Sequence, residues 1–167
     1  KGLQSLDWAN DPVHKLRQGY NSQRASIAHY AASDIAIEEV EFSSGIGLKF
    51  TPKLLTSDTD ILYFHGGGWI VGSPWTHKTL CSWMAKFTGQ KVFAAPYNLA
   101  PEHKFPTQAH QAVEITNHFL KRKTATKNNK QNHQNIVDKM ITKSSLKNNK
   151  DGTKKTNNGM YVLYNIH

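Results

Sequence analysis

The stretch that decides the fold is Leu62-Tyr63-Phe64-His65-Gly66-Gly67-Gly68-Trp69, a short apolar run that ends in three consecutive glycines. Glycine has no Cβ, so it reaches positive φ angles and lets another group approach main-chain N–H donors closely. Three consecutive glycines lose much conformational entropy on folding, so they are expected only where the backbone itself has a function. Converging N–H groups are the donors that stabilise an oxyanion in acyl transfer. We therefore interpret this loop as an anion-binding backbone, with a flexible surface turn as the alternative.

Strands and helices alternate around this loop. Each of two short buried strands is followed by a loop and then by an amphipathic helix, and this order predicts a right-handed parallel α/β arrangement. The four elements are expected, in chain order, at 61–64, 75–88, 91–95 and 107–120. At the start of the helix expected at 75–88, Ser73 offers an N-cap and Pro74 a first-turn proline, and Gly89 ends the helix. Its inward stripe is expected to be Leu80, Trp83, Met84 and Phe87, with Cys81 as a small buried neighbour.

The amino-terminal part has its own pattern. Residues 36–42 and 48–54 are predicted to be two strands that flank a Gly-Ile-Gly turn, and Pro52 indicates an edge position for the second. Residues 3–20 show helical spacing, with Asp11-Pro12 as a helix start. Residues 22–32 are either a second short helix or a loop. We expect a helical, cap-like segment at 1–35 and an α/β core at 36–120.

The net charge of +9 resides entirely in the last third of the chain. Residues 1–120 hold ten basic and ten acidic side chains, whereas residues 121–167 hold eleven basic and two acidic ones. The Lys/Asn-rich segment 121–167 has too few apolar residues to offset the entropy cost of ordering, so we predict a disordered basic tail. Without aromatic residues among its lysines, base stacking is unsupported and nucleic acid is not an expected partner. We expect no membrane span, and the single Cys81 favours the cytoplasm.

A second motif follows the glycines at Tyr97-Asn98-Leu99-Ala100-Pro101-Glu102-His103-Lys104-Phe105-Pro106. Together the two motifs resemble the hormone-sensitive-lipase-like esterase and lipase branch of the α/β-hydrolase superfamily, which pairs HGGGW with Y-R-L-A-P-E-x-x-F-P. The chain departs from this pattern at Asn98, where the family usually has Arg. The resemblance covers about residues 36–120, so it implies a truncated α/β hydrolase: the amino-terminal strands and first helices of a mostly parallel sheet.

The resemblance also implies roles for individual residues. The amides of Gly67 and Gly68 would form the oxyanion hole, because the HGGG loop supplies its donors in such esterases. Gly66 and His65 would support the loop, Trp69 would pack beneath it, and Glu102 would buttress it from the second motif. No cofactor and no metal is expected. His110, Glu114 and His118 share a helix face, but we interpret that face as solvated rather than as a zinc site.

No G-x-S-x-G nucleophile elbow occurs in the 167 residues, so the Ser-Asp-His triad of such enzymes is missing. Ser73 is interpreted as a cap rather than as a nucleophile. The expected function is that of a carboxylesterase or lipase-type hydrolase of small acyl esters, inactive alone. The alternatives are a non-catalytic interaction protein whose basic tail binds nucleic acid or acidic partners, and one half of a split hydrolase with a complementing chain. A sheet that lacks its nucleophile strand should have an open edge and should aggregate or remain molten.

Overall fold

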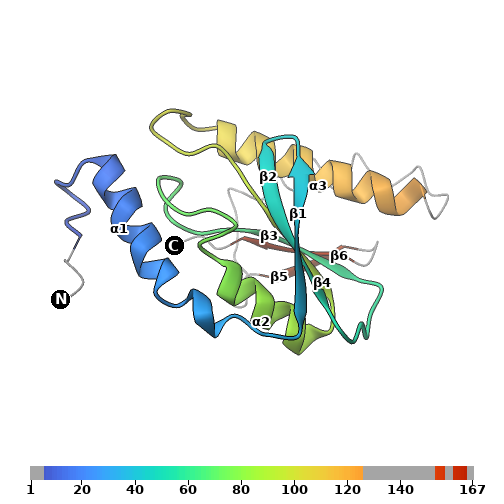
Figure 1. Ribbon diagram of the computed structural model, residues 1–167. Helices are drawn as coiled ribbons and strands as arrows, with labels where there is room; N and C mark the ends of the chain where they lie inside the picture. The colour runs from blue at the N-terminus through green and yellow to red at the C-terminus, as the bar shows by residue number, and fades with distance from the viewer. Residues whose placement is uncertain (1–5, 126–152, 157–159, 165–167) are drawn as a thin grey trace.

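The computed structural model describes residues 6–125, 153–156 and 160–164. They form a mixed six-stranded sheet with helices on both faces (Figure 1). The helical elements are α1 (Val13–Ala25), the 3-10 turn η1 (Ala28–Tyr30), α2 (Lys78–Thr88) and α3 (Thr107–Ala125). The strands are β1 (Ile35–Phe42), β2 (Gly45–Pro52), β3 (Asp60–Phe64), β4 (Lys91–Ala95), β5 (Thr153–Thr156) and β6 (Met160–Tyr164). Their order across the sheet is β1-β2-β4-β3-β6-β5.

The centre of this sheet is parallel and its flanks are antiparallel. Strand β3 runs parallel to β4 on one side and to β6 on the other. The pairs β1–β2, β2–β4 and β5–β6 are antiparallel. The predicted α/β fold class is confirmed, and the described sheet is mixed around a parallel centre. A short turn, such as the one between β1 and β2, can join only antiparallel neighbours, whereas β3-α2-β4 has the long crossover that parallel strands need.

Pro52 ends β2 but does not mark an edge strand. Strand β2 lies between β1 and β4, and β4 pairs only with Leu48–Phe50. Pro52 thus lies beyond the last pair with β4, where its missing N–H removes no hydrogen bond from that ladder. The expectation of an edge position was wrong because a strand can extend past its neighbour.

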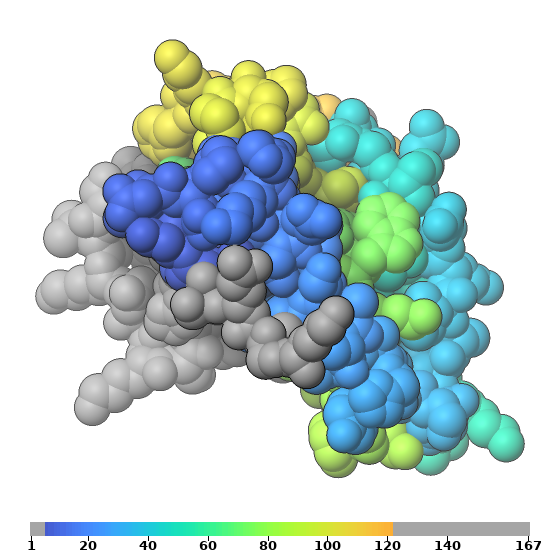
Figure 2. Space-filling model, turned by 60° about the vertical axis from the view of Figure 1, so that its left-hand side comes forward, coloured from blue at the N-terminus to red at the C-terminus, as the bar shows by residue number. Residues whose placement is uncertain are grey.

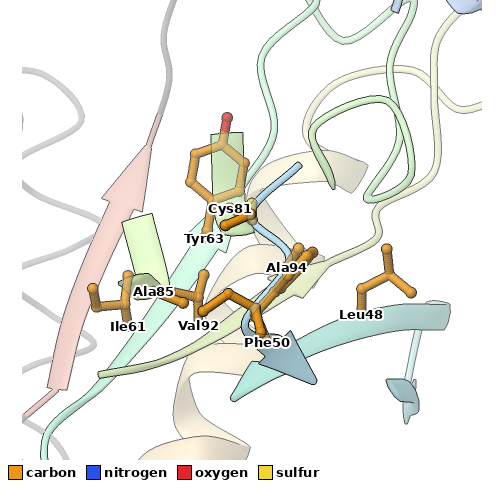
Figure 3. Packing of buried hydrophobic residues seen from close by; sticks show 10 residues of the cluster. Leu48, Phe50, Ile61, Tyr63, Cys81, Ala85, Val92 and Ala94 are labelled. Atoms are coloured by element: carbon orange, nitrogen blue, oxygen red, sulfur yellow. The ribbon is translucent and has the colours of Figure 1, made fainter. Parts of the chain in front are cut away.

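Helices α2 and α3 cover opposite faces of the sheet. Alternation along β3 sends Ile61 and Tyr63 into the cluster that contains α2, and Leu62 and Phe64 into the cluster that contains α3. Figure 3 shows the first cluster, in which Cys81 lies close to the ring of Tyr63. Both strands of the parallel pair are buried on both faces, as their continuous apolar runs predicted.

The inward face of α2 differs from the predicted one. Cys81, Ser82 and Ala85 are buried, so the expected burial of Cys81 is confirmed. The large residues expected on the core side lie largely outside it: Leu80 is 47% exposed, Trp83 36% and Phe87 80%. Small side chains let the helix axis approach the sheet closely, and this close approach outweighs the burial of larger residues. The helix also starts later than predicted, at Lys78. Ser73 instead accepts a hydrogen bond from the Thr76 amide (3.2 Å) in the turn before it.

The amino-terminal helix α1 starts directly after Pro12, as predicted, and continues to Ala25. Trp8 lies outside it and is 55% exposed. Leu16 and Tyr20 are buried against Val71, so α1 packs on the loop that follows β3. No helix among residues 6–125 has both the length and the apolar character that a membrane crossing requires.

Two segments of the predicted disordered tail are strands. All five residues of β6 pair with Asp60–Phe64 of β3, and β5 pairs with β6 on its other side. We expected that edge of β3 to be open; for these segments that expectation is corrected. Met160–Tyr164 is an apolar and aromatic run of the kind found in strands, and an unpaired edge is a template for such a run. Residues 126–152, the larger part of the predicted tail, lie outside the described residues.

Candidate functional site

The glycine loop leaves the carboxyl end of β3 and leads towards α2 (Figure 1). Its backbone adopts positive φ angles at Gly67 (127°), Gly68 (58°) and Trp69 (64°). The Gly67 carbonyl accepts hydrogen bonds from the amides of Ile70 and Val71 (3.0 and 3.1 Å). A Cβ on Gly67 would overlap the carbonyl oxygen of Val71. The turn therefore requires glycine at this position for two reasons, its φ angle and its close approach to Val71.

The amides of Gly67 and Gly68 have no hydrogen-bond acceptor among the described residues. A Cβ built on Gly68 meets no atom within 4 Å, so the space beside it is open. Backbone N–H groups are seldom left without a partner unless water or a ligand takes them. This loop thus offers two adjacent donors to a group from outside the described chain.

His65, at the start of the loop, is buried and neutral. Its Nδ1 lies 2.9 Å from the carbonyl oxygen of Gly66, and because a carbonyl only accepts, Nδ1 carries the hydrogen. Tyr97 stacks on the imidazole at 4.2 Å between ring centroids, and its hydroxyl donates to the His65 carbonyl (2.6 Å). Burial lowers the pKa of His65 to about 4. The ring is an uncharged structural support for the glycines.

A second buried histidine lies behind the first. His77 stacks on His65 with ring centroids 5.6 Å apart, and Tyr20 of α1 approaches its Nε2 at 3.5 Å. Its Nδ1 faces the carbonyl of Ser73 at 3.3 Å. Burial is the main cause that lowers the pKa of His77. The loop therefore rests on an aromatic stack that stays uncharged at neutral pH.

Trp69 does not pack beneath the loop as expected. Its indole is 46% exposed and stacks on the ring of Phe105, which is 67% exposed, with centroids 5.8 Å apart. The positive φ of Trp69 continues the left-handed turn begun at Gly68, and this geometry directs the side chain outward. The two rings form an exposed aromatic pair, of which Trp69 directly follows Gly68.

Glu102 contacts α1 rather than the glycines. Its carboxylate accepts two hydrogen bonds from the Arg17 guanidinium, at 2.8 and 2.6 Å. This bidentate pair lowers the pKa of Glu102 to about 2. The loop that carries Glu102 is joined to the glycine loop by a backbone hydrogen bond from the Ala100 amide to the Trp69 carbonyl (2.8 Å).

Comparison with known proteins agrees with this geometry. A family model described as alpha/beta hydrolase fold matches residues 61–138. A solved hormone-sensitive lipase from a metagenome library superimposes with a TM-score of 0.63 at 27% identity, over 71% of this chain and 38% of that one. The chain has part of the α/β-hydrolase fold. Over that part it is similar to the hormone-sensitive-lipase-like esterases.

The curated proteins that the chain matches include one named as a deacetylase-like protein and one named as an ester hydrolase. Human arylacetamide deacetylase-like 3 is 34% identical over 53% of this chain and 22% of its own length. Ethyl acetate hydrolase of Pseudomonas putida is 32% identical over 62% of this chain and 36% of its own length. The chain thus spans only about a fifth to two fifths of the relatives it matches.

Several residues that hold the α/β-hydrolase loops together escaped prediction. The Gln108 amide donates to the carbonyls of Asn98 (2.9 Å) and His103 (2.7 Å), and Gln111 accepts from the Asn98 amide (2.8 Å). These two glutamines of α3 hold the backbone around Asn98, where family members usually have Arg. A glutamine one turn into a helix has no distinctive pattern, so only the fold could show this role.

The expected absence of a metal site remains a prediction. Within the part of the chain that the structure describes, no three His, Cys, Asp or Glu side chains are grouped closely enough to hold an ion. His110, Glu114 and His118 are exposed on α3, as a solvated helix face would be.

Proposed function

We propose that this chain supplies the oxyanion-stabilising part of a carboxylic-ester hydrolase, with Gly67 and Gly68 as the donors. The observation that carries the proposal is the pair of adjacent amides that have no acceptor among the described residues and follow the carboxyl end of a central strand. When a nucleophile attacks an ester carbonyl, its oxygen gains negative charge, and preorganised N–H groups stabilise that charge without having to reorient.

The supporting roles follow from the same geometry. Gly66 offers its carbonyl to His65, and the neutral imidazole carries no positive charge that would compete for the oxyanion. Trp69 directly follows Gly68 and is half-exposed, so its indole would flank a small acyl ester bound at the glycine amides. Glu102 would act on the glycine loop indirectly, because it connects the second loop to Arg17.

The nucleophile, base and acid would come from polypeptide that these 167 residues do not include. The sequence contains no G-x-S-x-G elbow. A complementing chain is one source, and the remainder of a longer polypeptide is the other. The oxyanion donors act on whatever nucleophile is brought beside them, so the proposal is the same for both sources. We further propose the cytoplasm as its location, since the sequence has a single cysteine, Cys81, which is buried and free, as is usual in a reducing compartment.

A chimera tests the proposal. Residues 61–120 of this chain would replace the matching segment of the Pseudomonas putida ethyl acetate hydrolase, which would supply the triad. The chimera should hydrolyse ethyl acetate. Gly67→Ala keeps the amide N–H, but its Cβ would overlap the Val71 carbonyl and displace the turn, so it should lower kcat by about a hundredfold or more, the usual effect of losing a correctly placed oxyanion donor. Gly45→Ala, at the first residue of β2, is the control for backbone strain, and it is made in the full chain because the chimera does not include Gly45. The φ of Gly45 is also positive (131°), but a Cβ there would meet its nearest atom only at 3.9 Å.

The free energy of unfolding is measured for Gly45→Ala and for Gly67→Ala, both in the full chain. The comparison shows how much strain each substitution adds. A folded chimera without turnover would overturn the proposal. A chimera whose kcat is insensitive to Gly67→Ala would do so as well.

A further inference from the structure

We infer that Arg17 is a positioning residue that fixes the glycine loop relative to the Glu102 loop, so that helix α1 controls the geometry of the oxyanion donors. The inference rests on the proposed function for its meaning, but its test does not. Arg17 lies on α1, far from both motifs in sequence, and its hydrogen bonds go to Ile70, Ala100 and Glu102 rather than to the glycines.

One guanidinium joins three separate points. Its Nε donates to the carbonyl of Ile70 (2.8 Å), which follows the glycine turn. Its Nη2 donates to the carbonyl of Ala100 (2.8 Å) and, with Nη1, to the carboxylate of Glu102. Each of these partners is 53 to 85 residues away in sequence. All three nitrogens are therefore engaged with the two loops.

These contacts close a ring around one backbone hydrogen bond. The Ala100 amide donates to the carbonyl of Trp69, and Arg17 binds the carbonyl of the next residue, Ile70, together with the carbonyl of Ala100 itself. Movement of either loop would therefore lengthen at least two hydrogen bonds at once. Because Gly67 accepts from the amide of Ile70, a fixed Ile70 fixes the turn that orients the glycine amides.

The choice of arginine follows from its shape. Its planar fork presents several N–H donors in fixed directions, whereas lysine offers a compact ammonium on a flexible stem. The side chain of Arg17 is 29% exposed, so it lies in the contact between α1 and the second loop. Figure 2 shows α1, in blue, against the yellow residues of the 96–106 region on this face of the molecule.

Amide hydrogen exchange in the full chain tests the inference without any ester or nucleophile. In Arg17→Met, the amides of Ile70, Val71 and Ala100 should exchange about tenfold faster or more, since losing partly buried hydrogen bonds from a charged group lowers local stability by such a factor. The amides of Ile61 and Val92 in the sheet should keep their rates. Arg17→Lys should restore only part of the protection.

Two variants separate positioning from general destabilisation. Lys15→Met removes another cation of α1, whose ion pair is with Asp11 on the same segment, and should leave the three loop amides unchanged. Glu102→Gln alters an exposed partner and keeps the two carbonyl contacts of Arg17, so it should accelerate the same amides by a smaller factor. Unchanged loop exchange in Arg17→Met, or a parallel increase in the sheet, would overturn the inference. Full rescue by Arg17→Lys would also overturn it. The proposed function would be unaffected by any of these outcomes.

Discussion

Tyr97 lies flat against His65, with their ring planes 12° apart, and its hydroxyl donates to the backbone carbonyl of the residue that it stacks on. One side chain of the second motif thus fixes both the ring and the main chain of the first. The two motifs are separated by 32 residues in sequence, and this contact explains why they act as a unit. Together the two motifs hold His65, the residue from which the glycine turn begins, in a fixed position.

Tyr97→Phe should destabilise the fold while keeping the stacked ring. It removes the donor to the His65 carbonyl, which is buried, and a buried acceptor without its partner costs about 1–3 kcal/mol. Urea unfolding measures the change. Tyr30→Phe is the control, because Tyr30 is 62% exposed and its removal should shift the free energy of unfolding by less than about 0.5 kcal/mol. Equal effects of the two substitutions would contradict the assigned contact.

Acidification should destabilise the glycine loop through His65. Its folded pKa of about 4 lies below the unfolded value of 6.5, so the unfolded chain binds more protons between these values. The stabilisation is complete above pH 6.5 and is lost as the pH falls towards 4, by an amount on the order of 3 kcal/mol. Unfolding curves across this range measure it.

Two substitutions identify the source of that pH dependence. His65→Gln removes the titrating group and keeps an amide donor near the Gly66 carbonyl, so it should flatten the curve between pH 6.5 and 4. His103→Gln alters an exposed histidine and should leave the slope as it is. A slope that His65→Gln leaves unchanged would assign the pH dependence to another group, with the buried His77 as the next to test.

Local patterns in the sequence indicated the elements whose partners are nearby. Backbone preference indicates the glycine run, and apolar periodicity indicates the strands at 61–64 and 91–95. The partners of Arg17 and the pairing of β6 with β3 are separated by many residues, and no periodicity encodes them. The buried face of α2 was predicted wrongly because the prediction placed the largest apolar residues against the sheet. In the structure, the small residues Cys81, Ser82 and Ala85 are buried there instead.

The chain by itself should not hydrolyse short p-nitrophenyl esters. Oxyanion donors stabilise charge only after a nucleophile has attacked, and the sequence lacks the serine elbow that would supply one. Purified chain and a Gly67→Asp, Gly68→Asp variant should therefore give the same rate. Turnover that disappears in the variant would mean that a described residue acts as a nucleophile.

Trypsin should cut residues 121–150 before it cuts 61–119. The first stretch is rich in lysine and poor in large apolar residues, whereas the second includes β3, α2, β4 and most of α3. Mass spectrometry of a short time course would identify the early cuts. If the two stretches were cut at equal rates, the expected boundary near Leu120 would be wrong.

Removal of residues 126–167 should expose the edge of β3. In the structure, Met160–Tyr164 covers that edge over its full length, from Asp60 to Phe64. Without β6, the N–H and C=O groups on this side of a buried, apolar strand would face solvent and invite pairing between copies. We expect residues 1–125 to self-associate in size-exclusion chromatography with light scattering, and the full chain to remain monomeric to a higher concentration.

Two proline substitutions localise this effect to the strand that contacts β3. Proline at Val162 of β6, opposite Leu62, removes a ladder donor and should increase association as the truncation does. Proline at Lys155 of β5 disturbs only the outer pair, which leaves the edge of β3 covered, so it should have the smaller effect. If the truncated chain were as monodisperse as the full one, β6 would have no protective role. If the full chain aggregated as readily as residues 1–125, the open edge expected from the sequence would describe the protein better than the β3–β6 pair.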